Sequence, residues 1–327
     1  MTQLIALLQA GIMFGTVILY GSTGETLAEK SGNLNLGVPG IMYLGGIVGL
    51  MGVFFYEMNN PEPNKLVCIL IAMASAFLAA TLGGLIFSVL TITLRTNQIV
   101  TGLALTIFAG GFANFFGGSL NRLAGGVGQI SVATTSSAFR ASLPFAQDLP
   151  PVLGMLLGFG FMVYLAVAVA LFVDWFINRT SIGLNLRAVG ENPGTADAAG
   201  IKVILYKYLA TCIGAGISGL GGLFYVMDYT KGTWDSDGGI ERLGWLAVAL
   251  VIFSGWKPKK GIWGAYLFGM LFWLFFYIPD LTRRSMELFK MLPYLVTIIV
   301  LVVVSMRRRR ENEPPAGLGI PYFREER

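Results

Sequence analysis

Residues 65–92 read KLVCILIAMASAFLAATLGGLIFSVLTI, and the only charged residue among them, Lys65, stands at the start. A run of about 20 apolar residues is long enough to cross the hydrocarbon core of a bilayer as a helix. An open strand would leave backbone groups without hydrogen-bond partners in lipid, so the run must be helical. The stretch therefore predicts a membrane-spanning helix.

Eight further apolar runs share this character, and each is bounded by Gly, Pro or charged residues. They cover residues 3–21, 37–57, 97–117, 151–177, 204–227, 239–255, 261–279 and 288–306. Of the 327 residues, 55% are apolar and only 13% are charged, whereas soluble domains carry about 25% charged residues. We predict an all-α polytopic membrane protein of about nine transmembrane helices, which form one domain over residues 1–310. The Pro- and Gly-rich tail, residues 311–327, is predicted to be flexible.

The distribution of Lys and Arg predicts the orientation in the membrane. With the N-terminus outside and the C-terminus inside, most of the 23 basic residues fall on inner segments. The run Arg307–Arg310 after the last span indicates an anchor to anionic membrane lipid. The net charge of +5 thus reflects topology, and no nucleic-acid partner is needed to explain it.

Several chemistries are excluded by the residues that are missing. The chain has no His, and Cys68 and Cys212 lie in apolar runs without metal-ligand spacing. No GxxxxGK[ST] run is present, so the chain does not bind ATP through a P-loop. We predict that it binds no cofactor itself and that an ATP-driven function would place ATP and Mg on a partner ATPase.

Two segments show a weak sequence similarity to each other. Residues 37–45 and 239–247 both follow the pattern G-[VI]-x-x-[IL]-x-x-L-[GA] at the start of a span. The two spans run in opposite directions in the predicted topology, as an inverted repeat requires. Chance similarity in a chain rich in Gly and Leu is the alternative.

The predicted inner segment 178–203 contains signals for a short helix. Asn192 is a good N-cap, Pro193 suits the first helical position, and Gly200 can end the helix in a left-handed conformation. A helix of about two turns is unstable alone in water and must dock on something. The segment therefore predicts a contact with a partner protein, with a simple connecting loop as the alternative.

Three stretches resemble the inner-membrane permeases of ABC importers for simple sugars and nucleosides, in the group that includes ribose and branched-chain amino acid permeases. Residues 27–40 (LAEKSGNLNLGVPG) are similar to the family's LAERSG-x-x-NLGVEG run. Residues 95–105 (RTNQIVTGLAL) resemble its R-x-[DN]-[EQ]-x-[VI]-[ST]-G-x-A run. Residues 183–201 (GLNLRAVGENPGTADAAGI) match its GLxLRAVGENPxxAxxxGI loop and are followed by SGLGG at 218–222. Pro39 departs from the family, which more often has Glu there.

The resemblance implies a transport subunit and not an enzyme, in a bacterial or archaeal plasma (inner) membrane. It implies three protein partners: a cytosolic ABC ATPase, an extracytoplasmic solute-binding protein and a second permease. A short N-terminus suggests that the second permease is a non-identical one. The segment that couples to the ATPase would consist of Glu191, Asn192, Pro193, Gly194, Thr195, Ala196, Asp197, Ala198, Ala199, Gly200 and Ile201.

Uncharged polar and aromatic side chains in or beside the spans are the candidates for the substrate path. Intramembrane polar groups are costly and usually face a path or a helix partner. The path candidates are Asn33, Asn35, Gln98, Thr101, Phe108, Phe112 and Asn114. The alternatives for each are interhelical hydrogen bonding, capping or core packing. An acidic group on the outer side, Asp228, Asp235, Asp237 and Glu241, is either a contact for the binding protein or a solvated loop.

The favoured function is a permease subunit of an ATP-driven importer for a nucleoside or a simple sugar. An ion-coupled secondary transporter or channel is the alternative, but it would need carboxylates in mid-span. The carboxylates considered fall at span ends, namely Glu57, Asp174, Asp228 and Asp280. A membrane-embedded enzyme is disfavoured because no Ser/Lys, Asp/Asp or metal constellation lies at membrane depth.

Overall fold

The computed structural model describes residues 2–123, 125–126, 129–142, 157–278, 286, 288–289, 291–307 and 313–323. Over these ranges the regular structure is helical, with one isolated antiparallel bridge between Ser131 and Thr233. The predicted all-α class is confirmed for this part of the chain.

Each predicted apolar run contains a helix. In chain order the helices are α1 (Thr2–Glu29), α2 (Val38–Asn59), α3 (Lys65–Ser88), α4 (Gln98–Leu123), α5 (Ala133–Phe139), α7 (Phe161–Arg179), α8 (Ser181–Glu191), α9 (Pro193–Ala198), α10 (Val203–Phe224), α11 (Gly239–Ser254), α12 (Pro258–Trp273) and α14 (Leu292–Arg307). Short π-helical turns continue α3 and α10 as η1 (Val89–Thr93) and η3 (Tyr225–Tyr229), and a 3-10 turn continues α12 as η4 (Leu274–Tyr277). Residues 151–156, the predicted start of the fifth run, and Arg308 to Arg310 of the predicted lipid anchor lie outside the described residues.

Six helices in the described ranges are long and apolar enough to cross a membrane, namely Leu4–Glu29, Val38–Asn59, Lys65–Thr93, Gln98–Leu123, Phe161–Arg179 and Val203–Tyr229. The helices α11, α12 and α14 have 16 residues each. At 1.5 Å per residue they are about 24 Å long, less than the ~30 Å hydrocarbon core. The structure thus supports six spans by length, and the total of nine and the orientation stay predictions.

Glycines bring the central helices into backbone contact. A Cβ added to Gly45 on α2 would overlap the backbone of Gly219 on α10. One added to Gly24 on α1 would overlap the backbone oxygen of Gly214, also on α10. Small residues allow helices to approach closely in membranes. Lipid tails are as apolar as the side chains, so helix association there depends on close packing and not on the hydrophobic effect. The central position of α10 between α1, α2 and α3 follows from this glycine-rich surface.

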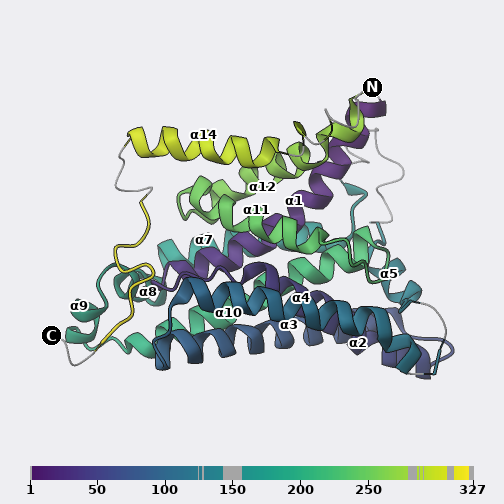
Figure 1. Ribbon diagram of the computed structural model, residues 1–327, viewed down its shortest axis with the longest axis horizontal. Helices are drawn as coiled ribbons and strands as arrows, with labels where there is room; N and C mark the ends of the chain where they lie inside the picture. The colour runs from purple at the N-terminus through teal and green to yellow at the C-terminus, as the bar shows by residue number, and fades with distance from the viewer. Residues whose placement is uncertain are drawn as a thin grey trace.

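The helices share a common long direction, which gives the molecule two ends (Figure 1). Helices α8 and α9 lie at one end, called the α9 end below, and α5 lies at the other, the α5 end. The two similar segments begin α2 and α11, which pack together where an added Cβ on Gly244 would lie 2.7 Å from Cα of Pro39. The inverted repeat itself stays a prediction.

The first helix is longer than predicted. The apolar run was expected to end at residue 21, but α1 continues to Glu29. Several polar residues of this extension are buried, including Thr23, Glu25 and Thr26. The extension carries Glu25 and Glu29 into the protein interior, which the sequence interpretation had not foreseen.

Candidate functional site

The short helix α9 has the local structure that its sequence predicts. The side-chain oxygen of Asn192 accepts a hydrogen bond from the backbone N of Thr195 at 2.9 Å, which makes Asn192 the N-cap. Pro193 occupies the first helical position. After Ala198 the chain turns through Gly200, whose φ of +84° is left-handed. The predicted start and stop of this helix are confirmed.

Helix α9 has one buried side chain, Ala196, and its other residues are half-buried or exposed. Ala196 is buried against Val189 of α8 and Val203 of α10. Thr195 and Ala198 are exposed, and a Cβ added to Gly194 would meet only the Asn192 side chain, at 3.5 Å. The exposed surface of α9 therefore carries only small side chains, and the buried Ala196 anchors the helix to α8 and α10. Such a surface suits insertion into a complementary socket on a partner protein.

The segment 30–37 lies next to α8 at the α9 end. A Cβ on Gly190 of α8 would overlap the backbone oxygen of Lys30. Burial lowers the pKa of the Lys30 side chain, and the nearby carboxylate of Glu191 acts in the opposite direction. Contacts of this closeness tie the segment after α1 to the segment that carries α9.

Two of the predicted path residues, Asn33 and Gln98, are buried with Lys207 in a polar network at this end. The amide nitrogen of Asn33 donates to the Thr211 hydroxyl at 2.9 Å, and its oxygen accepts from Nζ of Lys207 at 3.3 Å. The side-chain oxygen of Gln98 accepts from the backbone N of Leu34 at 2.7 Å. Asn33, Gln98 and Lys207 are each at most 5% exposed. In this conformation they join α10, α4 and the segment 30–37 and do not line an open path.

Asn35, the next path candidate, leads to the carboxylates that the sequence interpretation missed. Its backbone N donates to Glu25 at 3.0 Å, and its side-chain oxygen accepts from the backbone N of Gly37 at 2.9 Å. One helical turn on, Glu29 accepts a hydrogen bond from the indole Nε1 of Trp256. The i, i+4 spacing of Glu25 and Glu29 places both on one helix face, and this is the signal that could have identified them.

These two carboxylates are missing from the sequence-based survey of acidic groups. Glu25 and Glu29 lie in the last two turns of the candidate span Leu4–Glu29 and are 1% and 2% exposed, so they are buried carboxylates near a span end and not in mid-span. Both have hydrogen-bond donors, so each is satisfied as a structural acceptor. Of the residues in the survey, Asp280 lies outside the described ranges.

The remaining path candidates lie on α4, along a face that the other described helices leave open. Phe108 and Asn114 are exposed, and Thr101 and Phe112 are half-buried. An apolar groove of about 610 Å³ runs between this face and η1, and Thr101 and Phe108 are among the residues that line it. A Cβ added to Gly111 would meet nothing within 4 Å. The side-chain oxygen of Asn114 accepts from the Trp234 indole at 3.1 Å, which fixes the amide at the α5 end.

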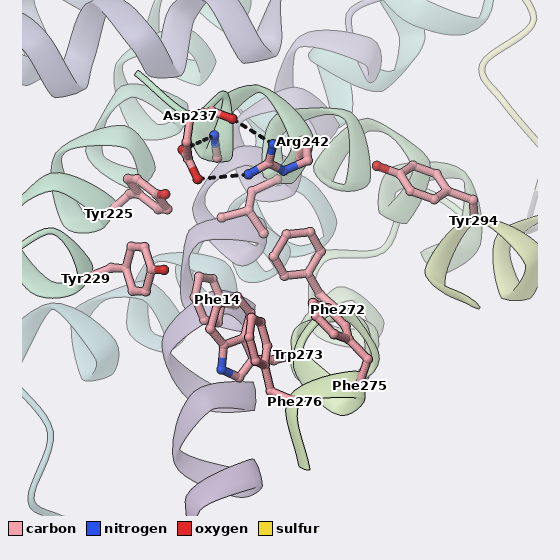
Figure 2. Close-up of a pocket in the computed structure, with 12 residues that line it drawn as sticks. Phe14, Tyr225, Tyr229, Asp237, Arg242, Phe272, Trp273, Phe275, Phe276 and Tyr294 are labelled. Carbon is pink, nitrogen blue, oxygen red and sulfur yellow. Dashed lines mark hydrogen bonds and ion pairs between the residues drawn. The ribbon is translucent and has the colours of Figure 1, made fainter. Parts of the chain in front are cut away.

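A second cavity, which the sequence did not predict, has a volume of about 530 Å³. Aromatic rings from α1, α12 and η4 form its floor, with the Phe14 and Trp273 centroids 4.7 Å apart. Figure 2 shows the hydroxyls of Tyr225 and Tyr229 pointing into the same space. The full lining is Phe14, Tyr225, Tyr229, Asp237, Gly239, Arg242, Leu243, Phe272, Trp273, Phe275, Phe276 and Tyr294.

An ion pair forms the polar rim of this aromatic cavity. Nη2 of Arg242 lies 3.0 Å from Oδ2 of Asp237, and the same guanidinium donates to the Asp237 backbone oxygen at 2.7 Å (Figure 2). The aromatic rings of the floor can stack on a planar ring or a sugar ring, and the hydrogen-bonding groups of the rim can bind its hydroxyl groups. Within the described residues, no three carboxylate or thiol side chains lie close enough together to hold a metal ion.

Comparisons with known proteins place the chain among permeases. Residues 7–301 match the family described as branched-chain amino acid transport system / permease component. A guanosine ABC transporter permease protein of Bacillus subtilis is 29% identical over 97% of this chain and 96% of its own length. A protein of Haloferax volcanii, provisionally named a glucose ABC transporter permease, is 32% identical over 81% of this chain and 75% of its own length.

A third relative, a nucleoside ABC transporter permease protein of Lactococcus lactis, is 28% identical over 89% of both chains. No solved structure gives a significant match. The similarity covers nearly the whole chain, including α9, the segment 30–37 and α4.

Proposed function

Since this chain belongs to the branched-chain amino acid transport system permease family, we propose that it is the membrane-spanning subunit of an ATP-driven importer for a nucleoside or a simple sugar. The observation that carries the proposal is the similarity to a guanosine permease over 97% of the chain. The chain is a multi-pass membrane protein with several long apolar helices. It catalyses no reaction itself, and ATP with Mg binds to a separate ATPase subunit.

Helix α9 and its flanks, residues 191–201, are the contact with that ATPase. The exposed, small-sided surface of α9 and its capped, rigid backbone support this role. When the ATPase dimer changes shape around ATP, a rigid helix seated in it moves as a body. In this assignment the α9 end faces the cytosol and the α5 end faces outward, toward a solute-binding protein.

The open face of α4 forms one wall of the substrate path, and a second, non-identical permease forms the other wall. The exposure of Phe108 and Asn114 and the empty space at Gly111 support this placement, because no described helix covers them. Thr101 and Phe112 belong to the same wall. In this proposal Asn33, Asn35 and Gln98 lie behind that wall and form the inner gate; their hydrogen bonds to α10, the segment 30–37 and α1 support a closed arrangement there.

The aromatic cavity favours a ring substrate over a linear one. Trp273 and Phe14 offer apolar faces for stacking, and the Asp237–Arg242 pair offers hydrogen-bond partners for hydroxyls. The cavity of about 530 Å³ lies within the range that small-molecule sites occupy, about 300–1,000 Å³. We assign it a transient contact with the substrate in the half of the subunit nearer the α5 end.

The test is uptake into proteoliposomes that contain this chain, the second permease and the ATPase, with the solute-binding protein added outside. Uptake of a nucleoside or sugar should require ATP inside the vesicles and should persist when proton and sodium gradients are dissipated. The isolated chain should hydrolyse no ATP. Uptake that follows an ion gradient without the ATPase would instead establish the ion-coupled alternative, for which Glu25 and Glu29 are the buried carboxylates to examine.

A further inference from the structure

Residues 313–323, called the strap below, lie across the α9 end and contact the segment that carries α9. The backbone N of Gly317 donates to the backbone oxygen of Gly190 at 2.9 Å. The backbone N of Ala316 donates to Oε2 of Glu191 at 3.3 Å, and the Tyr322 hydroxyl donates to Oδ2 of Asp197 at 2.9 Å. The yellow chain in Figure 1 follows this course past α8 and α9. The sequence had predicted a flexible tail here.

The same strap also contacts the inner ends of the proposed path. The backbone N of Gly319 donates to the backbone oxygen of Gly32 at 3.2 Å. The guanidinium of Arg95 lies 4.3 Å from the centre of the Phe323 ring, within the range of a cation–π contact. Arg95 precedes α4 and has a φ of +58°. This left-handed backbone conformation is energetically unfavourable for residues other than glycine. The strap thus touches α9, the segment 30–37 and the start of α4.

The strap closes a small cavity over the buried polar network. Pro321 and Tyr322 line a space of about 50 Å³ together with Asn33, Gln98 and Lys207. Lys207 is 3% exposed, and its Nζ donates to the amide oxygen of Asn33 at 3.3 Å. Tyr322 therefore shares this cavity with the network, packs on the apolar cluster of Val189, Ala196 and Val203, and donates its hydroxyl to Asp197 of α9.

Local sequence explains how a short segment can hold this position. A Cβ added to Gly317 would lie 2.8 Å from the Gly190 oxygen, so only glycine allows this approach without movement of the neighbour. Gly319 has a φ of +78°, which favours glycine. Pro314, Pro315 and Pro321 restrict the backbone and reduce the conformational entropy lost on docking.

Helix α9 packs on α8 and α10, whereas α4 packs on α2 and α3, which in turn pack on α10. The strap is thus a second, more direct connection between α9 and the start of α4, beside the one through α10 and the Asn33–Gln98 network. We propose that the strap is a positioning element for transport, in which Tyr322 and Phe323 pass the displacement of α9 to the start of α4 and to the Asn33–Gln98 network. This inference rests on the proposed function, since it assigns α9 to the ATPase contact.

The test compares coupling in the complete transporter, reconstituted with its ATPase, second permease and binding protein. Tyr322→Phe removes the hydrogen bond to Asp197 and keeps the ring, Phe323→Leu removes the cation–π contact, and the double variant removes both. Tyr206→Phe is the matched control, because it also keeps a ring that packs on the Val189–Ala196–Val203 cluster, and the hydroxyl that it removes accepts from Asn185 of α8 at 3.1 Å and not from the strap. ATP hydrolysis and substrate uptake are measured together in each variant.

We expect the double variant to hydrolyse ATP near the wild-type rate while the ATP consumed per substrate imported rises about fivefold or more, the lower range for coupling between sites. Tyr206→Phe should leave this ratio unchanged. A wild-type ratio in the double variant would overturn the proposal. So would a parallel loss of hydrolysis, uptake and assembly, since that is the behaviour of a merely structural segment.

A second measurement tests the contact between Tyr322 and Asp197 by itself. In a cycle of Tyr322→Phe and Asp197→Ala, the effect of the pair on the ratio should be smaller than the sum of the two single effects, because the two side chains share one hydrogen bond. Effects that add would contradict the proposal. If the wild-type complex shows no ATP-dependent uptake, the proposed function fails, and that result is distinct from a failure of the strap.

Discussion

The indole nitrogen of Trp256 donates a hydrogen bond to the carboxylate of Glu29, although the two residues are 227 positions apart. Trp256 follows the end of α11 and has a left-handed φ of +54°, and Glu29 ends α1. Both side chains are buried. This contact holds the end of α1, and with it the start of the segment 30–37, in a defined position.

Glu29→Ala should destabilise the subunit, because it leaves a buried indole N–H without a partner, at a cost of about 1–3 kcal/mol. Glu29→Gln keeps an oxygen acceptor and should cost less. The thermal unfolding midpoint of the purified protein in detergent measures both. Glu62→Ala, at an exposed loop position, is the control and should leave the midpoint unchanged. Equal midpoints for Glu29→Ala and the control would show that the contact contributes no stability.

Asn192→Ala combined with Gly194→Leu should uncouple ATP hydrolysis from uptake without unfolding the spans. Loss of the cap costs about 1 kcal/mol. Among the described residues, a Cβ added at Gly194 would meet only the Asn192 side chain, so we expect the defect to arise from a clash with the ATPase. Gly194→Ala is the small control and should retain most uptake. If the double variant binds the ATPase and transports normally, α9 is only a connecting loop.

Gly111→Leu should block uptake while leaving the subunit stable. The added side chain would enter the space beside Phe108 and Asn114, where this chain has no atoms within 4 Å of a new Cβ. Leu78→Phe on the exposed face of α3 adds bulk at a surface without a proposed role and is the control. Uptake and detergent stability are measured side by side. Normal uptake by Gly111→Leu would exclude this face from the path.

Trp273→Ala should weaken uptake by up to about tenfold, since an aromatic pair contributes about 0.5–1.5 kcal/mol beyond its buried area. The defect should be larger for ring substrates than for a linear polyol of similar polarity. Phe172→Leu on α7, an exposed ring outside the cavity, should have no such effect. A loss that is equal for ring and linear substrates would assign Trp273 to packing alone.

Single-cysteine labelling should establish the orientation. With Cys68 and Cys212 replaced by Ala, a cysteine at the exposed Ser137 of α5 should react with an impermeant maleimide in intact cells. A cysteine at the exposed Thr195 of α9 should react only after permeabilisation. The reverse pattern would invert the proposed topology and remove α9 from the cytosolic ATPase. A reporter fused after Arg310 should be active in the cytoplasm only.

The sequence alone was sufficient for features encoded within a few turns of chain. Apolar length predicted a helix in each of the nine runs, and Asn192, Pro193 and Gly200 predicted the start and stop of α9. The motifs at 27–40, 95–105 and 183–201 indicated the permease family that the match over 7–301 shows. These properties depend on neighbouring residues and on the lipid environment, so no knowledge of distant contacts was needed.

Only the tertiary structure decided which polar groups are buried and what they touch. The Asn33–Thr211 hydrogen bond joins residues 178 positions apart. The strap contacts Asp197 of α9, 125 positions from Tyr322, and also Arg95, near the start of α4. The burial of Glu25 and Glu29 depended on the unexpected length of α1, and the aromatic cavity drew rings from four separate helices. Contacts of this kind leave no periodic pattern in the local sequence. They form where glycine-rich helix faces pack together, and that packing depends on the whole chain.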